Sequence, residues 1–505
     1  MIQRIAQFII SVLSSRRFIF VIVGILVVQA VWLAFSVQFP MAFDESYHFG
    51  LIQVYAHQWL PFITSEPAGA SGYGVITRYD SYLFHYLMSF PHRVFTLFVS
   101  DWASQIIFLR LINIALFAGG IVLFKRLLTR FNVSRAVVHF VLLMFVLIPV
   151  VPTLAATINY DNFVFLLVPI IAGLTLTCVT SLLKNNSVPT RSLMLLLSVG
   201  FVGSLSKYAF VPIFVGALIC VFVVWLRSRN KRRMLASIVP SFKKLSRPVK
   251  IILSVFFVVS TGLFLERYGG NLVMYHGFEP ACTQVKSLDE CLSYGPWGRN
   301  YQLAANVAAS NPPLDPGLIE YPGEWVGQSL YKLYFTINYD FVESDPLPIP
   351  YIVASVIGIA GIILSIIFWK SIWRKDKRLF ILATISVVYV GGLFAVNFSE
   401  FLKYHTVVAV NGRYLILVLP LMLLIIGLAY QHLFDRLLKK RARSFTAIFS
   451  IVILLLALQG GGAMTYLLRS QPMWYWQYQP LIDFNTALKN VISPFVIDSK
   501  DTSPK

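Results

Sequence analysis

FIFVIVGILVVQAVWLAFSVQ, residues 18–38, is the first long apolar run of the chain, and FPMAFDESYH, residues 39–48, follows it directly. A run of this length can cross a hydrocarbon core of about 30 Å as an α-helix. The acidic pair Asp44-Glu45 and His48 therefore lie just beyond the end of a predicted membrane span. Because charge is costly in an apolar setting, acidic residues kept at a membrane boundary usually mark function.

The whole chain has the composition of a membrane protein. Its 505 residues are 57% hydrophobic and 13% charged, and the mean hydropathy is +0.72. These values lie outside the range of soluble globular domains. Many separate runs of roughly 17 to 23 apolar residues predict spanning helices, whereas a closed barrel needs short alternating segments. The sequence therefore indicates a polytopic, helical membrane protein.

Eleven apolar runs predict an all-α fold with about 11 transmembrane helices. The runs are 18–38, 105–124, 136–152, 162–183, 192–206, 208–226, 251–266, 350–369, 379–396, 412–431 and 444–467. A twelfth candidate, 81–99, carries polar residues at helical spacing. They are Ser81, His85, Ser89, His92 and Thr96. This stripe predicts an amphipathic helix that lies in the membrane interface, preceded by a short helix at 46–58.

The distribution of charge predicts the orientation. With the N-terminus inside, 28 of the 42 Lys and Arg residues lie in cytoplasmic segments, together with only two acids, Asp376 and Asp435. Counting 81–99 as a span would place Lys125 and Arg126 outside, against the positive-inside rule. Topology thus explains the net charge of +20 without a nucleic-acid partner. We expect a plasma-membrane protein with a cytoplasmic N-terminus and an external C-terminus.

This topology divides the chain into four regions. Residues 1–266 are an N-terminal membrane module whose first external loop, 39–104, holds the acidic pair. Residues 267–349 form a large external loop, 350–467 a C-terminal transmembrane bundle, and 468–505 an external tail.

The four cysteines differ in context. Cys282 and Cys291 lie in the large polar loop, where a disulfide is expected if the loop faces an oxidising compartment. Cys178 and Cys220 lie inside apolar runs and are expected to be buried thiols.

The acidic pair offers two interpretations. Asp44 can cap a helix that begins near Glu45, because unpaired N–H groups and the helix dipole favour a carboxylate there. Alternatively, Asp44 and His48 share one helix face and converge on a metal or a substrate hydroxyl. We therefore take Asp44, Glu45 and His48 as catalytic candidates.

A second polar cluster, Asn159-Tyr160-Asp161, is predicted to face the same side as Asp44. Asn159 or Asp161 can cap the following helix. Considered together, Asp44 and Asp161 can also bracket an acceptor or share a divalent cation such as Mg or Mn.

Two basic residues on this side suit an anionic ligand. Lys207 lies in a predicted tight hairpin, where its ammonium group can bind phosphate as a point charge. Arg413, in Asn411-Gly412-Arg413-Tyr414, can clamp a phosphate bidentately, although simple snorkelling to the interface also explains it. Further candidates on the same side share a polar side chain in an external loop. They are Arg78, His85, Arg299 and Tyr414.

These motifs resemble the GT-C superfamily of integral-membrane glycosyltransferases. Phe43-Asp44-Glu45-Ser46-Tyr47-His48 and Asn411-Gly412-Arg413-Tyr414 are most similar to a multi-pass family with an early Pro-Asp-Glu-x-x-His motif and a late Gln-Gly-Arg-Tyr motif. The Cys-x8-Cys loop and Ile158-Asn159-Tyr160-Asp161 add to the likeness. Phe43 replaces the proline and Asn411 the glutamine, so every charged position of the two motifs is kept.

The resemblance implies an inverting transfer of a sugar from a polyprenyl-phosphate donor to a glycan, lipid or protein acceptor at the external face of the bilayer. Asp44 would be the general base. Glu45 and Asp161 would orient it or hold a divalent metal, and Arg413 and Lys207 would offset the charge of the departing lipid phosphate.

Two other classes of protein compete with an enzyme. A transporter or lipid flippase needs charges along a path through the membrane, and a non-catalytic assembly subunit needs no acidic pair. The candidate charges lie on one predicted face, with few ions inside the spans, and this asymmetry favours the enzyme.

Overall fold

The computed structural model describes residues 2–62, 73, 78–228, 230–310, 317–335, 349–438 and 442–496. Regular structure within these residues is helical, apart from one isolated antiparallel bridge between Val37 and Tyr475. The predicted all-α fold class is therefore confirmed.

Among the described residues, eight helices, some with an adjoining turn, are long and apolar enough to cross a membrane. They are α2 (Phe18–Ser36), α5 (Trp102–Leu128), α8 (Tyr160–Asn185), α10 (Val211–Arg227), α13 (Arg247–Phe264), α19 (Ile349–Ile367), α21 (Phe380–Tyr404) and α22 (Leu419–Leu438). Two shorter apolar helices, α9 (Thr190–Ser206) and α23 (Ala442–Leu458), also coincide with predicted spans. The number of crossings stays a prediction.

Three predicted spans are interrupted at Pro or Gly. The run 136–152 forms α6 (Arg135–Val146) and α7 (Val150–Ala156), which bend by 71° at a break that contains Pro149. Proline lacks the N–H that would continue a helix. Likewise α22 begins only at Leu419, which places Pro420 in its first turn. The run 444–467 stops near Gly460, whose φ of 150° lies outside the helical region.

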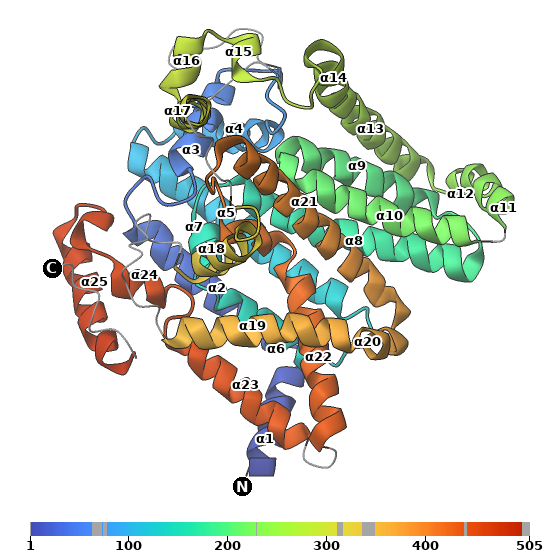
Figure 1. Cartoon of the computed structure of the whole chain (residues 1–505). Helices are drawn as coiled ribbons and strands as arrows, with labels where there is room; N and C mark the ends of the chain where they lie inside the picture. The colour runs from blue at the N-terminus through green and yellow to red at the C-terminus, as the bar shows by residue number, and fades with distance from the viewer. Residues whose placement is uncertain are drawn as a thin grey trace.

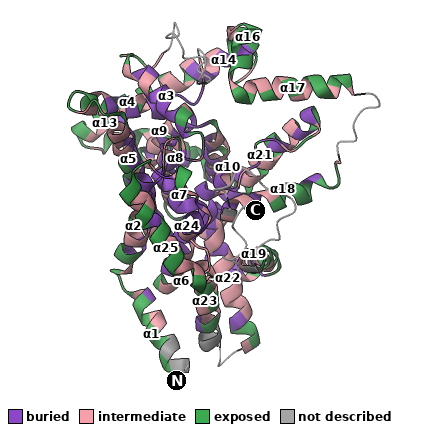
Figure 2. Ribbon diagram, turned by 90° about the vertical axis from the view of Figure 1, so that its left-hand side faces the viewer, coloured by how far each residue is buried: buried purple, intermediate pink, exposed green. Residues whose placement is uncertain are grey.

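A packed helical core lies at the centre of the molecule. Helices α8, α9 and α10 run side by side in Figure 1, and α5 packs on α8. The rings of Phe117, Phe145 and Phe165 stack between α5, α6 and α8, with centroids 4.1 Å apart for Phe117 and Phe165. Figure 2 shows that buried residues concentrate in these central helices, while exposed positions dominate the peripheral ones.

Five of the helices between the spans gather at one end of this core, the top of Figure 1. They are α3 (Glu45–Ala56), α4 (Leu83–Thr96), α15 (Cys282–Val285), α16 (Leu288–Ser293) and α17 (Gly295–Ala309). The N-terminal helix α1 (Ile2–Ser14) lies at the opposite end. The predicted helices at 46–58 and within 81–99 are thus present as α3 and α4.

Helix α4 turns most of its polar stripe into the protein, although Thr96 at its end is exposed. Ser89 and His92 are buried, whereas Leu87, Phe90 and Val94 are exposed. An apolar face turned outward suits a helix in contact with lipid. Most of the polar residues of this stripe therefore face the interior of the protein and not the solvent.

The cysteines lie as predicted. Cys282 and Cys291 form a disulfide, and Cys178 and Cys220 are free and buried. The division into four regions and the orientation in the membrane stay predictions.

Candidate functional site

Asp44 stands at a left-handed turn just before α3. Phe43 and Asp44 have φ values of 67° and 62°, a conformation that costs a non-glycine residue about 1–3 kcal/mol and persists only where the surroundings impose it. The Asp44 side chain makes no capping hydrogen bond, so the predicted cap is wrong. Instead Oδ2 accepts a hydrogen bond from Nη2 of Arg413 at 2.7 Å, and the Asp44 side chain is 58% exposed.

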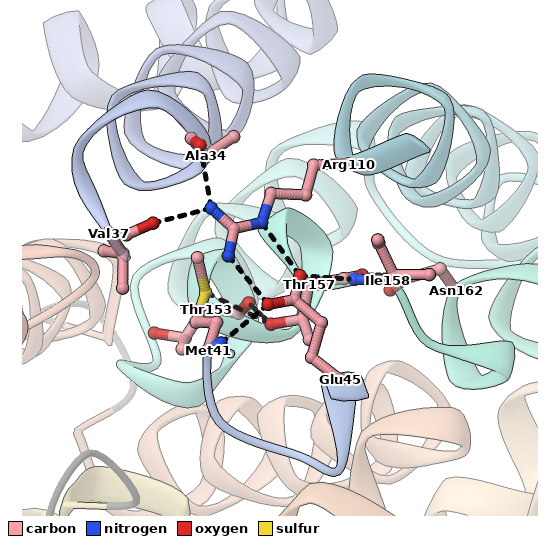
Figure 3. Close-up of polar contacts among 9 residues, drawn as sticks. All are labelled: Ala34, Val37, Met41, Glu45, Arg110, Thr153, Thr157, Ile158 and Asn162. Carbon is pink, nitrogen blue, oxygen red and sulfur yellow. Dashed lines mark hydrogen bonds and ion pairs between the residues drawn. The ribbon is translucent and has the colours of Figure 1, made fainter. Parts of the chain in front are cut away.

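Glu45 has the opposite environment. Its carboxylate is fully buried and accepts bonds from Nε and Nη2 of Arg110 at 2.8 and 2.7 Å. The backbone N–H groups of Met41 and Ile158 also donate to it, at 2.6 and 3.2 Å. Figure 3 shows this bidentate pair at the centre of the polar contacts. A carboxylate with four donors is not free to hold a metal, which corrects one of the two predicted roles of Glu45; the other, orienting Asp44, stays a prediction.

Arg110 ties together segments that are distant in the chain. Besides Glu45, its Nη1 donates to the carbonyl oxygens of Ala34 and Val37, at 2.9 and 2.7 Å (Figure 3). We call the Arg110–Glu45 pair and these two carbonyl contacts the clamp. It joins the end of α2, the start of α3 and helix α5. Sequence reasoning missed Arg110, although an arginine inside the predicted span 105–124 is itself a signal, since such charges are rare and need a partner.

Asn159 fixes the turn from the other side. Its Nδ2 donates to the carbonyl oxygen of Phe43 at 2.9 Å, and its Oδ1 accepts the N–H of Asp161 at 2.8 Å. The predicted cap of the helix at 160 is therefore present and comes from Asn159. Together with the clamp, this contact imposes the left-handed backbone that presents Asp44.

Asp161 and Lys207 form a buried ion pair. The Lys207 ammonium also lies over the rings of Tyr160 and Tyr414, 4.6 and 4.8 Å from their centroids. Lys207 sits where predicted, in the turn between α9 and α10. Oδ2 of Asp161 is buried and has no partner among the described residues.

Arg413 lies in a short 3-10 turn, Gly412–Leu417, that Asn411 caps by accepting the Arg413 N–H at 3.0 Å. Gly412 is required there, because a Cβ would come within 2.3 Å of the Ser329 carbonyl oxygen of α18 (Tyr321–Phe335). The Arg413 side chain is 7% exposed and stacks near Phe43 and Tyr414, each 5.1 Å away.

Two donors of Arg413 are left over. Its Nε and Nη1 are buried and have no hydrogen-bond partner among the described residues. Buried guanidinium donors are costly to leave unpaired, so their position beside an accessible carboxylate points to an anionic ligand.

His48 and His85 form a buried pair behind Asp44. Nδ1 of His48 lies 2.8 Å from Nε2 of His85, and the rings stack with centroids 5.1 Å apart. Burial, together with His85, Arg413 and Lys207, lowers the pKa of His48 well below its usual range, and burial lowers the pKa of His85 to about 3. Both imidazoles are therefore neutral near pH 7. His48 pairs with His85, and its predicted convergence with Asp44 on a substrate hydroxyl stays a prediction.

Aromatic rings border the site. Tyr47 of α3 lies 6.1 Å from Tyr294, and Tyr294 lies 5.0 Å from Trp297. Tyr79 packs against the disulfide that precedes Tyr294. The disulfide-linked segment, which the sequence could not place, therefore forms one wall next to the Asp44 turn.

Two predicted residues lie apart from these contacts. Arg78 pairs with Glu266 at 2.8 Å and donates to Asn271 at 2.8 Å. Arg299 is exposed on α17, where it donates to its neighbour Asn300 at 3.0 Å. The structure thus brings together Asp44, Asp161, Lys207, Arg413 and Tyr414, and leaves these two arginines out.

The predicted divalent metal does not fit this arrangement. Asp44 and Asp161 are each paired with a cation, and the described residues contain no group of three or more His, Cys, Asp or Glu side chains placed to hold a metal ion. Arg413 and Lys207 supply positive charge where the metal was predicted.

Comparison with known proteins finds a similar solved structure. No protein-family model matches the sequence, and no curated protein matches it. The crystal structure of an oligosaccharyltransferase from Archaeoglobus fulgidus, tethered to an acceptor peptide with an NVT sequon, is similar with a TM-score of 0.41 and 13% identity. The similarity covers 97% of this chain and 58% of that chain, so this chain spans little more than half of that enzyme. A likeness at this level carries no argument about the chemistry of the site.

Proposed function

We propose that the protein is a membrane glycosyltransferase that moves a sugar from a polyprenyl-phosphate donor to an acceptor hydroxyl at the external face of the membrane. One observation carries the proposal. The accessible carboxylate of Asp44 lies 2.7 Å from Arg413, a buried arginine with two donors that find no partner among the residues that the structure describes. A base and a phosphate-binding cation in contact are the two groups that this transfer needs.

The roles follow from these contacts. Asp44 accepts the proton of an acceptor hydroxyl while its oxygen attacks the anomeric carbon. The bond from that carbon to the phosphate oxygen breaks, and the lipid phosphate leaves with the electron pair. Arg413 supplies hydrogen bonds to that phosphate and Lys207 supplies charge. Attack opposite the leaving group inverts the anomeric carbon.

The other site residues position these groups. Glu45 and Arg110 anchor the turn of Asp44, Asn159 holds the carbonyl of Phe43, and Tyr414 lies beside both cations. The rings of Tyr47 and Tyr294 offer faces on which a sugar can pack.

The leaving group provides a test that does not require the sugar to be known. We expect the protein to bind undecaprenyl phosphate more tightly than undecaprenol, because only the phosphate can use the free donors of Arg413. Arg413→Gln should weaken binding of the phosphate by roughly 10- to 150-fold, the usual worth of a charge-assisted hydrogen bond. Arg413→Lys keeps the charge but loses the planar set of guanidinium donors, so its affinity for the phosphate should lie between those of the wild type and Arg413→Gln.

Native mass spectrometry of the purified protein in detergent measures these affinities. The control is Arg299→Gln, which removes an exposed arginine outside the site contacts. It should leave the affinity for both lipids unchanged. Equal binding of the phosphate and the alcohol by the wild-type protein would reject a phosphate site at Arg413.

A further inference from the structure

An apolar cavity lies far from Asp44. It has a volume of about 490 Å3 and lies between the ends of α8, α9 and α10 and the short helices α11 (Lys231–Ala236) and α12 (Ile238–Lys243). Every residue that lines it is apolar or aromatic, and Leu193, Ile219, Trp225 and Leu235 are among them. A cavity of this size and lining suits a hydrocarbon chain.

The surroundings of the cavity are strongly basic. The connection 227–250 contains nine Lys and Arg residues and no acid, and the neighbouring connection 184–191 adds Lys184 and Arg191, also without an acid. On α11, Lys231, Arg232 and Arg233 are exposed. These cations lie on the helix that contributes Leu235 to the cavity, and they complement an anionic group.

Helices α11 and α12 form a fixed wall of this cavity. The N–H of Val188 donates to Oγ of Ser237 at 2.9 Å, and Oγ1 of Thr190 donates to the carbonyl oxygen of Ile238 at 2.9 Å. Both bonds tie the basic connection to the connection 184–191. The cations are thus held beside an apolar cavity instead of on a loose tail.

The indole of Trp225 lies at the cavity and carries a polar group that suits a ligand. Its ring lines the cavity, and Lys231 lies over it, 5.9 Å from the centroid. Its Nε1 is buried and has no hydrogen-bond partner among the described residues. An indole N–H without a partner in the described part of the chain, on a ring that contacts both an apolar cavity and a cation, suits an ester or phosphate oxygen.

We infer that this cavity binds an anionic phospholipid, with an acyl chain among Leu193, Ile219 and Trp225 and the phosphate headgroup at Lys231, Arg232 and Arg233. Positive-inside topology explains basic connections in general, but it explains neither the cavity nor the unpaired indole N–H.

The lipid site lies across the protein from the candidate catalytic site. Helix α8 begins beside Asp161 and ends at Asn185, and 26 helical residues extend about 39 Å. Figure 1 likewise places α11 and α12 beyond the far ends of α9 and α10, away from α3. The inference therefore does not depend on the proposed transferase activity.

The test compares dioleoyl phosphatidylglycerol with dioleoyl phosphatidylcholine on the full-length protein in detergent, with native mass spectrometry as the readout. We expect tighter binding of phosphatidylglycerol. The triple variant Lys231→Gln/Arg232→Gln/Arg233→Gln should lose roughly 100-fold in affinity for it, on the scale expected for three cations at a lipid surface. Ile219→Trp, which narrows the cavity and keeps every charge, should also weaken binding.

A matched control removes the same charge elsewhere. Lys370, Arg374 and Lys375 are exposed on α20 (Trp369–Lys375), and their triple replacement by Gln should leave phosphatidylglycerol binding unchanged. Equal losses in the two triple variants, equal affinity for both lipids, or displacement of phosphatidylglycerol by excess inorganic phosphate would each overturn the inference.

Discussion

Asp44 and Glu45 are adjacent, carry the same charge and have opposite environments. Asp44 is 58% exposed and touches Arg413, whereas Glu45 is buried against Arg110. The left-handed turn at Phe43 and Asp44 separates them, because it sends one carboxylate outward and the next one into the core. Only the outward carboxylate is free for chemistry, so the pair is one accessible acid and one anchor.

The buried histidines predict a dependence of stability on pH. In the unfolded chain a histidine has a pKa near 6.5, and burial in the folded protein lowers the pKa of His85 to about 3 and that of His48 well below its usual range. Below pH 6.5 the unfolded state therefore binds protons that the folded state does not. The free energy of unfolding should fall by up to about 1.4 kcal/mol per pH unit for each histidine.

The measurement is denaturant unfolding in detergent at a series of pH values from 7.5 downward. In the double variant His48→Gln/His85→Gln, we expect the slope below pH 6.5 to be smaller than in the wild type. An unchanged slope would show that the imidazoles are not held neutral.

At the scale of elements, the Arg110–Glu45 pair joins α2, α3 and α5 and so carries the turn that presents Asp44. Removing one partner of a buried pair leaves an uncompensated charge, which typically costs about 3–5 kcal/mol. Glu45→Ala should therefore lower the free energy of unfolding by about that amount, and Glu45→Leu/Arg110→Leu should recover part of it.

The partly exposed pair of Arg78 and Glu266 serves as the comparison for this prediction. Glu266→Ala should cost no more than about 1 kcal/mol, because solvent screens that pair. If Glu45→Ala and Glu266→Ala were equally mild in the same unfolding experiment, the clamp would not be a major anchor.

Sequence patterns predicted the positions of the helices better than the points where a helix bends or begins. Hydropathy located the apolar helices, and the polar stripe of 81–99 identified α4. The bend at Pro149 and the late start of α22 were missed, because a window of apolar residues ignores where a proline interrupts the backbone hydrogen bonds.

At the scale of the whole molecule, the candidate site combines residues from distant parts of the chain. Asp44 and Arg413 are 369 positions apart, and Lys207 and Asp161 are 46 apart. Motifs and predicted topology placed these four residues on one side of the membrane. Their pairing could not be predicted, because it depends on how α8, α9 and the 3-10 turn at Gly412 pack together.

The errors in the predicted site arose because the sequence does not show which charged residues pair with each other. Arg110 lies inside an apolar run and pairs with Glu45, so the Glu45 carboxylate is not free to hold the predicted metal. Arg78 and Arg299 share the predicted side with the site but find Glu266 and Asn300 instead. The predicted side of the membrane is therefore a weaker criterion for a site residue than a buried donor that has no partner among the described residues, such as Nε of Arg413.

The most direct test of the proposed function measures transfer of radiolabel from polyprenyl-phosphate sugars, supplied as a panel that includes mannose and glucose, in membranes that contain the protein. Asp44→Asn keeps the size of the side chain and removes the base, so we expect transfer to fall by roughly 100-fold or more at unchanged protein abundance. Asp289→Asn, an exposed acid on α16, should transfer like the wild type. Full transfer by Asp44→Asn, where the wild-type protein is active, would contradict the proposal.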